Sequence, residues 1–281
     1  MSSKDRSALP QLYVLLSAVL FSTGGLFFKV IPWDALAISS ARSMLAGTAI
    51  FVILLIKKHR FRVNRTVLIT AAAITATNTL YALANKMTTA GNTIVLQFTM
   101  PVFVILIMLV FFRQRPTRLE IAVCSVTFLG IVLFFVDGLS AGNLAGNLLA
   151  LLSGLCYAVF FVWNSREDSE PFTSILLSYL AAALIGLPSL LNTDMAASAP
   201  PTLLAVLALG LLQQALGHGL FAVGIKRTPP VNASLISGIE PILNPLLVAV
   251  FYHELLTPLS LFAAAIVLCA VLYYNVRSAK G

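Results

Sequence analysis

Three residues that can carry charge lie inside long apolar runs of this chain: Glu240, His218 and Arg42. Charge is costly in an apolar environment, so such groups are expected to face the interior of a helix bundle. A carboxylate and an imidazole can each bind and release a proton, and a guanidinium can pair with a carboxylate. These residue types therefore predict proton coupling by Glu240 and His218, with Arg42 as the candidate for a structural ion pair.

Polar residues around these groups recur at i, i+3, i+4 and i+7, which places each set on one face of a helix. The three stripes are Asn78, Tyr81 and Asn85; Gln214, His218 and Phe221; and Ser237, Glu240 and Asn244. Aromatic side chains on neighbouring runs could stack on a planar or cationic substrate. The predicted substrate-binding residues are Asn78, Tyr81, Gln97, Tyr157, Trp163, Gln214, His218, Ser237, Glu240 and Asn244. A structural interpretation stays open for each, because amides often form interhelical hydrogen bonds worth only about 0.6 kcal/mol and Trp163 also suits an interfacial aromatic belt.

Glu240 is the one carboxylate near the middle of an apolar run. It precedes Pro241, which has no amide to bond to the carbonyl one turn back and so can open the helix there. Burial disfavours the charged form of a carboxyl group. We therefore predict that Glu240 binds and releases a proton or a cationic amine. The alternatives are a permanent pair with Arg42 and, for His218, a satisfied core position.

The elements that must position these residues are membrane-spanning helices. The 281 residues are 59% hydrophobic and 10% charged, with a mean hydropathy of +0.96, outside the range of a soluble domain. A spanning helix needs about 20 apolar residues. Ten runs meet this requirement: 10–30, 35–56, 66–86, 91–112, 118–136, 144–164, 172–192, 202–225, 230–251 and 257–276. The sequence thus predicts an all-α membrane protein with ten transmembrane helices.

Basic residues predict the orientation of these helices. With the N-terminus in the cytoplasm, 15 of the 18 Lys and Arg residues fall on the inner side, Lys29 and Lys86 on the outer side, and Arg42 within the membrane. We expect both termini to be cytoplasmic and the protein to lie in the plasma (inner) membrane. The net charge of +8 is then topological and does not indicate nucleic acid. The acidic segment 167–170 is expected to be a solvated turn, and Lys86 and Lys226 to be interfacial anchors.

An internal repeat relates the two halves of the chain. Sliding the sequence by 140 residues aligns Asn92 with Asn232, Pro101 with Pro241 and Lys86 with Lys226 without a gap. The repeats are predicted at 1–140 and 141–281, with five helices each. Because five is odd, the second repeat must enter the membrane from the opposite side, which gives two inverted five-helix repeats and favours alternating access. We expect Asn78 to lie opposite His218, and the fourth and ninth helices to meet near their prolines.

Four short stretches carry a resemblance to a known family. They are 82–92 (Ala-Leu-Ala-Asn-Lys-Met-Thr-Thr-Ala-Gly-Asn), Pro101-Val102-Phe103, Ile239-Glu240-Pro241 and 251–257 (Phe-Tyr-His-Glu-Leu-Leu-Thr). With its ten helices in two inverted repeats, the whole chain resembles an EamA-type member of the drug/metabolite transporter superfamily. One departure is Gln114, where the family has a Glu before the fifth helix. The resemblance implies export or exchange of small organic metabolites through a central cavity.

The sequence therefore predicts a secondary active transporter. No phosphate-binding loop for ATP hydrolysis and no hydrolase motif is present, so an enzyme is not expected. One carboxylate, one histidine and several amides suit amino acids, amines or similar zwitterions, exported or exchanged by alternating access. The alternative is an uptake or exchange carrier for a larger planar metabolite, such as a nucleoside-like or drug-like compound. We expect a small-molecule substrate, a lipid bilayer, no cofactor, no metal, and a monomer or homodimer.

Overall fold

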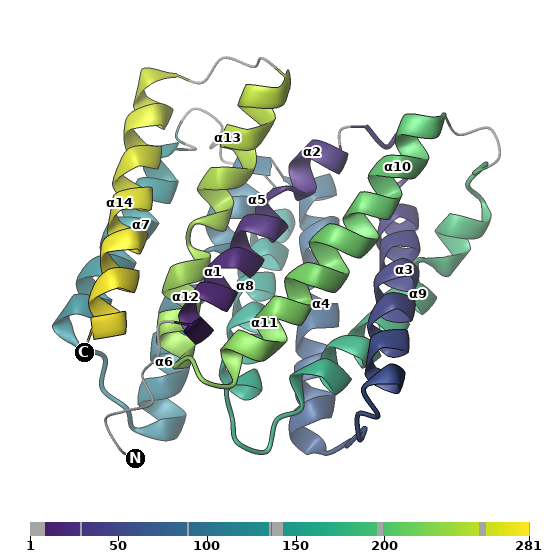
Figure 1. The fold of residues 1–281 in the computed structure, drawn as a ribbon. Helices are drawn as coiled ribbons and strands as arrows, with labels where there is room; N and C mark the ends of the chain where they lie inside the picture. The colour runs from purple at the N-terminus through teal and green to yellow at the C-terminus, as the bar shows by residue number, and fades with distance from the viewer. Residues whose placement is uncertain are drawn as a thin grey trace.

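The computed structural model describes residues 9–28, 30–88, 90–134, 136, 143–195, 199–252 and 257–280, and the regular structure over these residues is helical. Ten helical bodies follow one another (Figure 1). They are α1 (Leu9–Ser22) with α2 (Gly24–Phe28); α3 (Ala35–Ile56); α4 (Arg65–Met87); α5 (Ala90–Gln97) with α6 (Met100–Phe112); α7 (Arg118–Phe134); α8 (Leu144–Asn164); α9 (Pro171–Leu191); α10 (Pro200–Ala208) with η2 (Leu209–Leu216) and α11 (Gly217–Ile225); α12 (Pro230–Ser237) with α13 (Glu240–Tyr252); and α14 (Pro258–Lys280). Lys29 and Glu254 lie outside the described residues, as do the side chains of Asn85 and Lys86.

Local sequence explains where the helices begin. Asp34 and Asn64 cap α3 and α4, accepting hydrogen bonds from Leu36 N (3.0 Å) and Val67 N (2.8 Å). The helices α9, α10 and α12 start with proline, whose missing amide costs nothing in the first turn. Cap and proline positions therefore agree with the ends of the apolar runs, and the prediction of ten helices is confirmed.

The packing of the helices repeats between the two halves. α4 packs on α8 as α1 packs on α11, and α5–α6 pack on α8 as α12–α13 pack on α1. Likewise α3 contacts η2 as α9 contacts α4, while α3 with α9 and α7 with α14 form pairs across the halves. Exchanging the halves leaves this scheme unchanged, as a twofold relation requires. Each half has five spans and the second starts where the first ended, so the predicted inverted arrangement is confirmed (Figure 1).

Two helices are broken at related positions. The fourth body breaks at Phe98 and Thr99 between α5 and α6, and the ninth breaks at Gly238 and Ile239 between α12 and α13. In each case a proline is the second residue of the following segment, where it needs no amide. The eighth body deviates differently, because residues 209–216 form a π-helix while the related stretch of α4 is regular. These irregular segments carry several of the predicted site residues.

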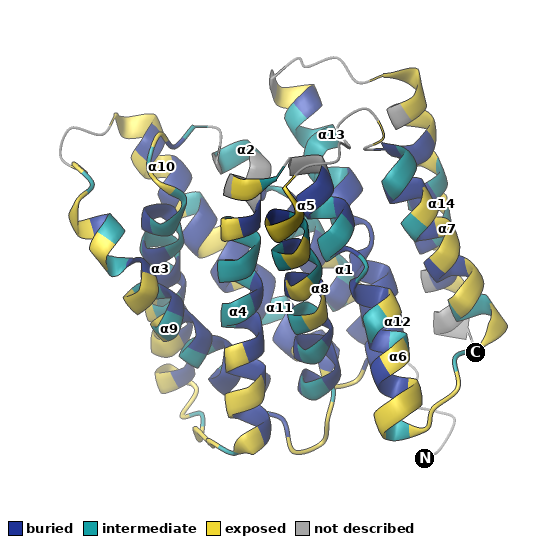
Figure 2. Cartoon of the chain, turned by 180° about the vertical axis from the view of Figure 1, so that it is seen from behind, coloured by how far each residue is buried: buried dark blue, intermediate teal, exposed yellow. Residues whose placement is uncertain are grey.

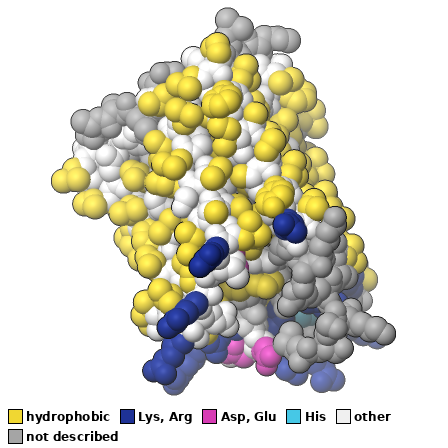
Figure 3. Space-filling view, turned by 90° about the vertical axis from the view of Figure 1, so that its left-hand side faces the viewer, with side chains coloured by type: hydrophobic (Ala, Val, Ile, Leu, Met, Phe, Trp, Pro, Cys, Tyr) yellow, Lys and Arg dark blue, Asp and Glu magenta, His cyan; other side chains and the backbone are white. Residues whose placement is uncertain are grey.

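The surface of the bundle matches a membrane protein. Seven helices are long and apolar enough to span a bilayer, and the shorter segments Leu9–Ser22 and Leu261–Tyr274 are also apolar. Buried residues line the inward faces of the helices (Figure 2), and hydrophobic side chains cover the flank while Lys and Arg gather at one end (Figure 3). We call this the basic end; it holds the connections α3–α4, α6–α7, α8–α9 and α11–α12. The opposite end, with the connections α2–α3 and α9–α10, is called the far end.

In the α8–α9 turn at the basic end, Glu167 and Asp168 are exposed as expected, while Ser169 is buried and Glu170 is partly buried. The turn is also held by several hydrogen bonds. Asp168 accepts hydrogen bonds from Thr66 Oγ1 (2.6 Å) and Arg166 Nε (2.9 Å), and its carbonyl accepts one from Asn64 Nδ2 (2.7 Å). Lys226 Nζ donates to the carbonyls of residues 166, 167 and 169 at 2.8–3.2 Å. Lys226 is thus a clamp on this turn, a more specific role than the interfacial anchor that its position predicts.

Candidate functional site

A hydrogen-bond cluster joins α9 to the eighth helical body in the interior of the bundle. The Tyr179 hydroxyl donates to the Gln214 carbonyl oxygen (2.9 Å) and lies 2.8 Å from His218 Nδ1. The side-chain oxygen of Gln214 is 3.2 Å from the same hydroxyl, and His218 Nδ1 is 3.2 Å from the Gln214 carbonyl. All three residues are less than a tenth exposed. The Tyr179 hydroxyl hydrogen is used in the bond to the Gln214 carbonyl oxygen. If His218 carries its proton on Nδ1, that N–H can donate to the Tyr179 oxygen, so both contacts of the hydroxyl are hydrogen bonds.

Arg42 of α3 lies beside this cluster. It interacts electrostatically with Tyr179 and with His218. Its helix packs against η2, where the backbone approach is close enough that a Cβ on Gly210 would lie 3.3 Å from the Arg42 carbonyl. Arg42, Tyr179, Gln214 and His218 form what we call the Arg42 pole. A guanidinium near a phenol and an imidazole is an arrangement suited to an anionic group.

Glu240 belongs to a separate cluster. It is the first residue of α13, directly after the break in the ninth body, and it interacts electrostatically with Tyr157 of α8. Its Oε2 is buried and has no hydrogen-bond partner among the described residues. Within the described residues the salt bridges join His59 to Glu170 and Arg166 to Asp168, so this conformation contains no bridge between Glu240 and Arg42. We call Glu240 and Tyr157 the Glu240 pole.

Aromatic rings connect the two poles. The Phe21 ring lies 4.6 Å from the His218 ring, and Phe160 stacks on Phe221 at 5.0 Å. Phe160 is 6.5 Å from His218 on one side and 6.1 Å from Tyr157 on the other. The His218 and Tyr157 rings are therefore no farther apart than these two distances together. Packed aromatic rings therefore join the two poles, and the Phe160 and Phe221 side chains among them are fully buried.

The other predicted residues are distributed over the bundle. Gln97, at the end of α5, donates from Nε2 to Ser153 Oγ of α8 (3.3 Å). Trp163 lies in the last turn of α8, where its ring meets Phe112 at 6.3 Å, a position that fits the structural interpretation. The remaining predicted residues are Asn78 and Tyr81, half-buried on α4, Ser237, buried at the end of α12, and Asn244, half-buried on α13. Their role in binding stays a prediction.

Two residues of the interior were not among the predicted site residues. Tyr179 is the centre of the Arg42 pole, and Gln213 donates from Nε2 to the Phe21 carbonyl (3.2 Å) while its Oε1 is buried without a partner in the described part of the chain. A signal for Tyr179 exists, because a tyrosine in mid-helix lies away from the interfacial level that this residue prefers. Gln213 could not be assigned to the interior from helical spacing, because adjacent residues of a regular helix point in different directions. The π-helix nevertheless buries both Gln213 and Gln214.

Two residues of the motif at 82–92 join the α4–α5 connection to the start of α8. Asn92 Nδ2 donates to Thr88 Oγ1 and to Asn147 Oδ1, both at 3.1 Å, and Thr88 Oγ1 donates to Asn147 Oδ1 at 2.7 Å. In the second half, Asn232 accepts a hydrogen bond from the Tyr274 hydroxyl (2.6 Å). These asparagines therefore fix helix starts in both halves, and they lie outside the two poles.

Two surface pockets lie toward the ends of the bundle. The larger, of about 660 Å³, is at the far end between the α2–α3 and α9–α10 connections. The smaller, of about 370 Å³, is at the basic end between α1, α9 and α11 and includes Glu170, Lys226 and Arg227. Neither includes a residue of the two poles.

Comparison with known proteins agrees with this architecture. The model of the EamA-like transporter family matches residues 9–136 and again 144–276. Threonine/homoserine exporter RhtA of Escherichia coli strain K12 is 29% identical over 196 residues, which cover 69% of this chain and 65% of RhtA. An uncharacterized transporter of Archaeoglobus fulgidus is 27% identical over 264 residues (92% of this chain, 93% of that protein), and the uncharacterized transporter YwfM of Bacillus subtilis is 24% identical over 279 residues (96% and 94%). A solved crystal structure at 16% identity has a TM-score of 0.83 over 96% of this chain and 98% of its own, and shows the fold alone.

Proposed function

This chain belongs to the EamA-like transporter family, and from that membership we propose that it exports small zwitterionic amino acids. The protein is a multi-pass membrane transporter of small molecules and not an enzyme. The name of the RhtA relatives supports amino acids as the substrate class, although the match spans 65% of their length. The observation that carries the proposal is the placement of Arg42 and Glu240 in two separate interior clusters.

The two poles suit the two charges of an amino acid. The Arg42 guanidinium donates hydrogen bonds to the substrate carboxylate, with the Tyr179 hydroxyl and the His218 imidazole as further hydrogen-bonding groups. The Glu240 carboxylate accepts the ammonium group, and the neighbouring Tyr157 ring presents a face to the same cation. A buried carboxylate whose Oε2 lacks a partner is costly, and a bound cation removes that cost.

Alternating access is proposed to operate through the broken helices. Glu240 follows the break between α12 and α13, so a bend there changes the direction in which its carboxylate points. The related break between α5 and α6 lies against α8, which carries Tyr157. Opening toward one end and then the other exposes Glu240 to two different environments, which is the requirement for coupling transport to a proton or to exchange.

The remaining parts of the proposal concern organisation. We assign the repeats to residues 1–140 and 141–281, the basic end and both termini to the cytoplasm, and the protein to the plasma (inner) membrane. The charge distribution supports this orientation, because cytoplasmic loops carry an excess of Lys and Arg and the described basic loops meet at one end (Figure 3). A single chain contributes both poles, so a monomer suffices for transport.

A competition experiment tests the zwitterion site. Purified protein in liposomes is loaded with L-threonine, and the entry of labelled L-threonine by counterflow is measured against unlabelled competitors. The expected competitors carry both charges. 3-Hydroxybutyrate, which lacks the amine, and 1-amino-2-propanol, which lacks the carboxylate, are expected to compete at least tenfold less well. Equal competition by either analogue would refute the pole that it cannot use. Competition by a nucleoside in place of threonine would favour the planar-substrate alternative, which the stacked Phe160 and Phe221 rings could serve.

The variant Glu240→Gln tests the role of the carboxylate. It preserves shape and hydrogen bonding but removes the charge, so we expect folded protein with little threonine transport or an altered pH dependence. The matched control is Glu120→Gln. Glu120 caps the start of α7 with Thr117 and lies 3.5 Å from the Tyr274 hydroxyl, at a place outside the two poles, and Gln serves equally in the capping pair. Wild-type rates with an unchanged pH profile in Glu240→Gln would leave Glu240 as a packing residue.

A further inference from the structure

Gln213 is a buried side chain of the interior that belongs to neither pole and is only half hydrogen-bonded. It is 7% exposed and lies in η2, next to Gln214 of the Arg42 pole. Its Nε2 donates to the Phe21 carbonyl oxygen (3.2 Å), whereas its Oε1 is buried and has no hydrogen-bond partner among the described residues. A buried acceptor without a donor is costly, so a further donor is expected at this atom.

The orientation of the Gln213 amide is fixed by its neighbours. Phe21 lies in the last turn of α1, where carbonyls have no partner within the helix, and only the NH₂ group of the amide can donate to one. A Cβ on Gly24 would lie 2.6 Å from the same Nε2, so the backbone at the start of α2 also meets the nitrogen side of the amide. The oxygen therefore points away from the α1–α2 junction and is available to a donor on its other side.

The α1–α2 junction lies beside the elements that carry both poles. α1 and α2 contact η2 on one side and α13, which begins with Glu240, on the other (Figure 1). The Phe21 ring is also 4.6 Å from the His218 ring of the Arg42 pole. Gln213 is thus fixed to a junction that contacts the carriers of both poles, and it lies close to the Arg42 pole itself.

A polar pair at this place is not required by the fold. The repeat relates Gln213 and Gln214 to Ala73 and Ile74, 140 residues earlier, which are apolar and buried in the regular helix α4. The second half has two glutamines in a π-helix instead, and π-helical turns often occur at functional sites. Because one glutamine of the pair already bonds Tyr179 in the Arg42 pole, a role in the same site is the simplest reason for the other.

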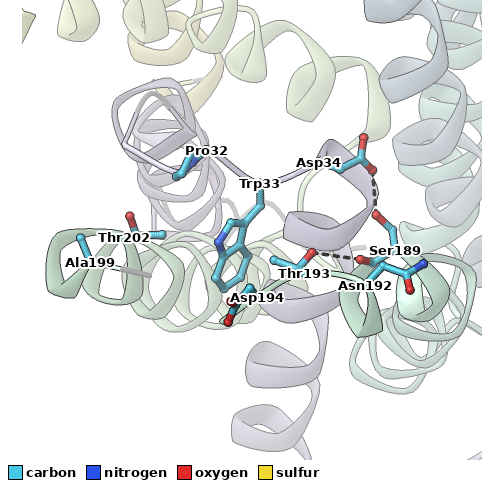
Figure 4. Close-up of a pocket in the computed structure, with 9 residues that line it drawn as sticks. All are labelled: Pro32, Trp33, Asp34, Ser189, Asn192, Thr193, Asp194, Ala199 and Thr202. Carbon is cyan, nitrogen blue, oxygen red and sulfur yellow. Dashed lines mark hydrogen bonds between the residues drawn. The ribbon is translucent and has the colours of Figure 1, made fainter. Parts of the chain in front are cut away.

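The acceptors at the far-end pocket differ from Gln213, because they already have donors. Asp34 Oδ2 accepts hydrogen bonds from Leu36 N (3.0 Å) and from Ser189 Oγ (2.9 Å) (Figure 4). The Ser189 carbonyl oxygen accepts one from Thr193 Oγ1 (2.9 Å). These bonds hold two surface connections together, whereas the acceptor of Gln213 is in the interior and is still unused.

We infer that Gln213 is a specificity-determining residue of the transport site, whose Oε1 accepts a hydrogen bond from a hydroxyl group on the side chain of the amino acid. The inference rests on the proposed function, in which the two poles take the carboxylate and the ammonium group. The side chain of the substrate is then the part left to offer a donor, and a neutral amide oxygen suits a neutral hydroxyl group. An analogue without the hydroxyl group leaves the buried acceptor unpaired and is rejected. Hydroxy amino acids are thus favoured over aliphatic ones of the same shape.

Threonine and valine have nearly the same shape and differ by one hydroxyl group, so they test the acceptor directly. In the counterflow assay with the wild-type protein, we expect unlabelled L-threonine to compete at least about tenfold better than L-valine. L-2-Aminobutyrate, which also lacks the hydroxyl group, should compete as weakly as valine.

Equal competition by threonine and valine would overturn the inference about the hydroxyl group. The zwitterion site would still stand if 3-hydroxybutyrate and 1-amino-2-propanol competed poorly in the same assay, so the two failures are distinguishable. A complete absence of threonine counterflow would refute both proposals.

Replacement of Gln213 shows which group provides the selectivity. Gln213→Met keeps a side chain of similar length but removes the donor and the acceptor, so threonine and valine are expected to compete within about twofold of each other. Gln213→Glu retains an acceptor oxygen in either protonation state and should keep the preference for threonine. The matched control is Gln11→Met, the same change at a buried glutamine about three turns before Phe21 on α1, where the preference should also persist.

A variant that folds but does not transport is tested through the shift of its unfolding midpoint in detergent on addition of threonine or valine, which requires binding alone. A preference for threonine that persists in Gln213→Met would remove Gln213 from substrate selection. That result would identify a buried water molecule as the partner of Oε1. Loss of the preference in Gln213→Met alone is the result expected for a hydroxyl-binding residue.

Discussion

Gly154 lies where α8 crosses the break between α5 and α6, and replacing it with alanine tests how closely the two elements are packed. A Cβ at this position would lie 2.6 Å from the Gln97 carbonyl oxygen and 3.2 Å from both the Gln97 carbonyl carbon and the Leu96 oxygen. All three are backbone atoms, so no side-chain rotation relieves the clash. Overpacking costs about 1–3 kcal/mol, against which the helix propensity of alanine returns up to about 1 kcal/mol. With that full gain, we expect Gly154→Ala to lower the free energy of unfolding by up to about 2 kcal/mol.

Gly219→Ala is the matched control, since a Cβ there meets nothing within 4 Å and the residue lies in α11. This variant should be as stable as the wild type or gain about 0.5–1 kcal/mol from helix propensity. The assay is the unfolding midpoint of the purified proteins in one detergent, read by intrinsic fluorescence. An unfolding midpoint for Gly154→Ala at or above that of Gly219→Ala would refute the close crossing. Displacement of α5 should also break the Gln97–Ser153 hydrogen bond, so threonine transport is expected to fall.

Two further predictions concern the basic end. The Thr66 hydroxyl, followed by Arg166, lowers the pKa of Asp168 below its ordinary value of 3.8, so the stabilisation is present above that value and is lost as pH falls through the lowered pKa. The stability difference between wild type and Asp168→Asn should therefore be constant at neutral and mildly acidic pH and shrink only below pH 3.8. Thermal unfolding measured across this pH range checks the prediction. A stability difference that grows on acidification would contradict a lowered pKa. Arg115→Cys in intact cells should resist a membrane-impermeant thiol reagent applied from outside, and ready labelling would reverse the proposed orientation.

The helices were predictable because the membrane leaves a spanning segment few alternatives. Backbone groups in lipid must be bonded within the segment, so an apolar run of sufficient length becomes a helix. The run 35–56 gives Ala35–Ile56, and the run 144–164 gives Leu144–Asn164. The breaks were less predictable, because proline alone does not decide them. Pro188 and Pro245 lie inside continuous helices, whereas Pro101 and Pro241 follow breaks.

The site was predictable in its charges but not in their partners. Helical spacing shows which residues share a face, and it correctly places Gln214 and His218 together. It does not show which residue of another helix meets that face, so Tyr179 was missed as the centre of the cluster. The π-helix at 209–216 was equally invisible, because a run of apolar residues has the same composition whether its hydrogen bonds are regular or widened.

The bonded α8–α9 turn has a consequence for cooperativity. Its residues are held by α4 through Thr66 and Asn64, from the first half of the chain, and by α11 through Lys226, from the second half. One turn of residues 165–170 is therefore the common partner of both helices, and its conformation is set by both sets of hydrogen bonds. A mutation on either side of the turn is expected to weaken both attachments together, so their effects should be strongly non-additive.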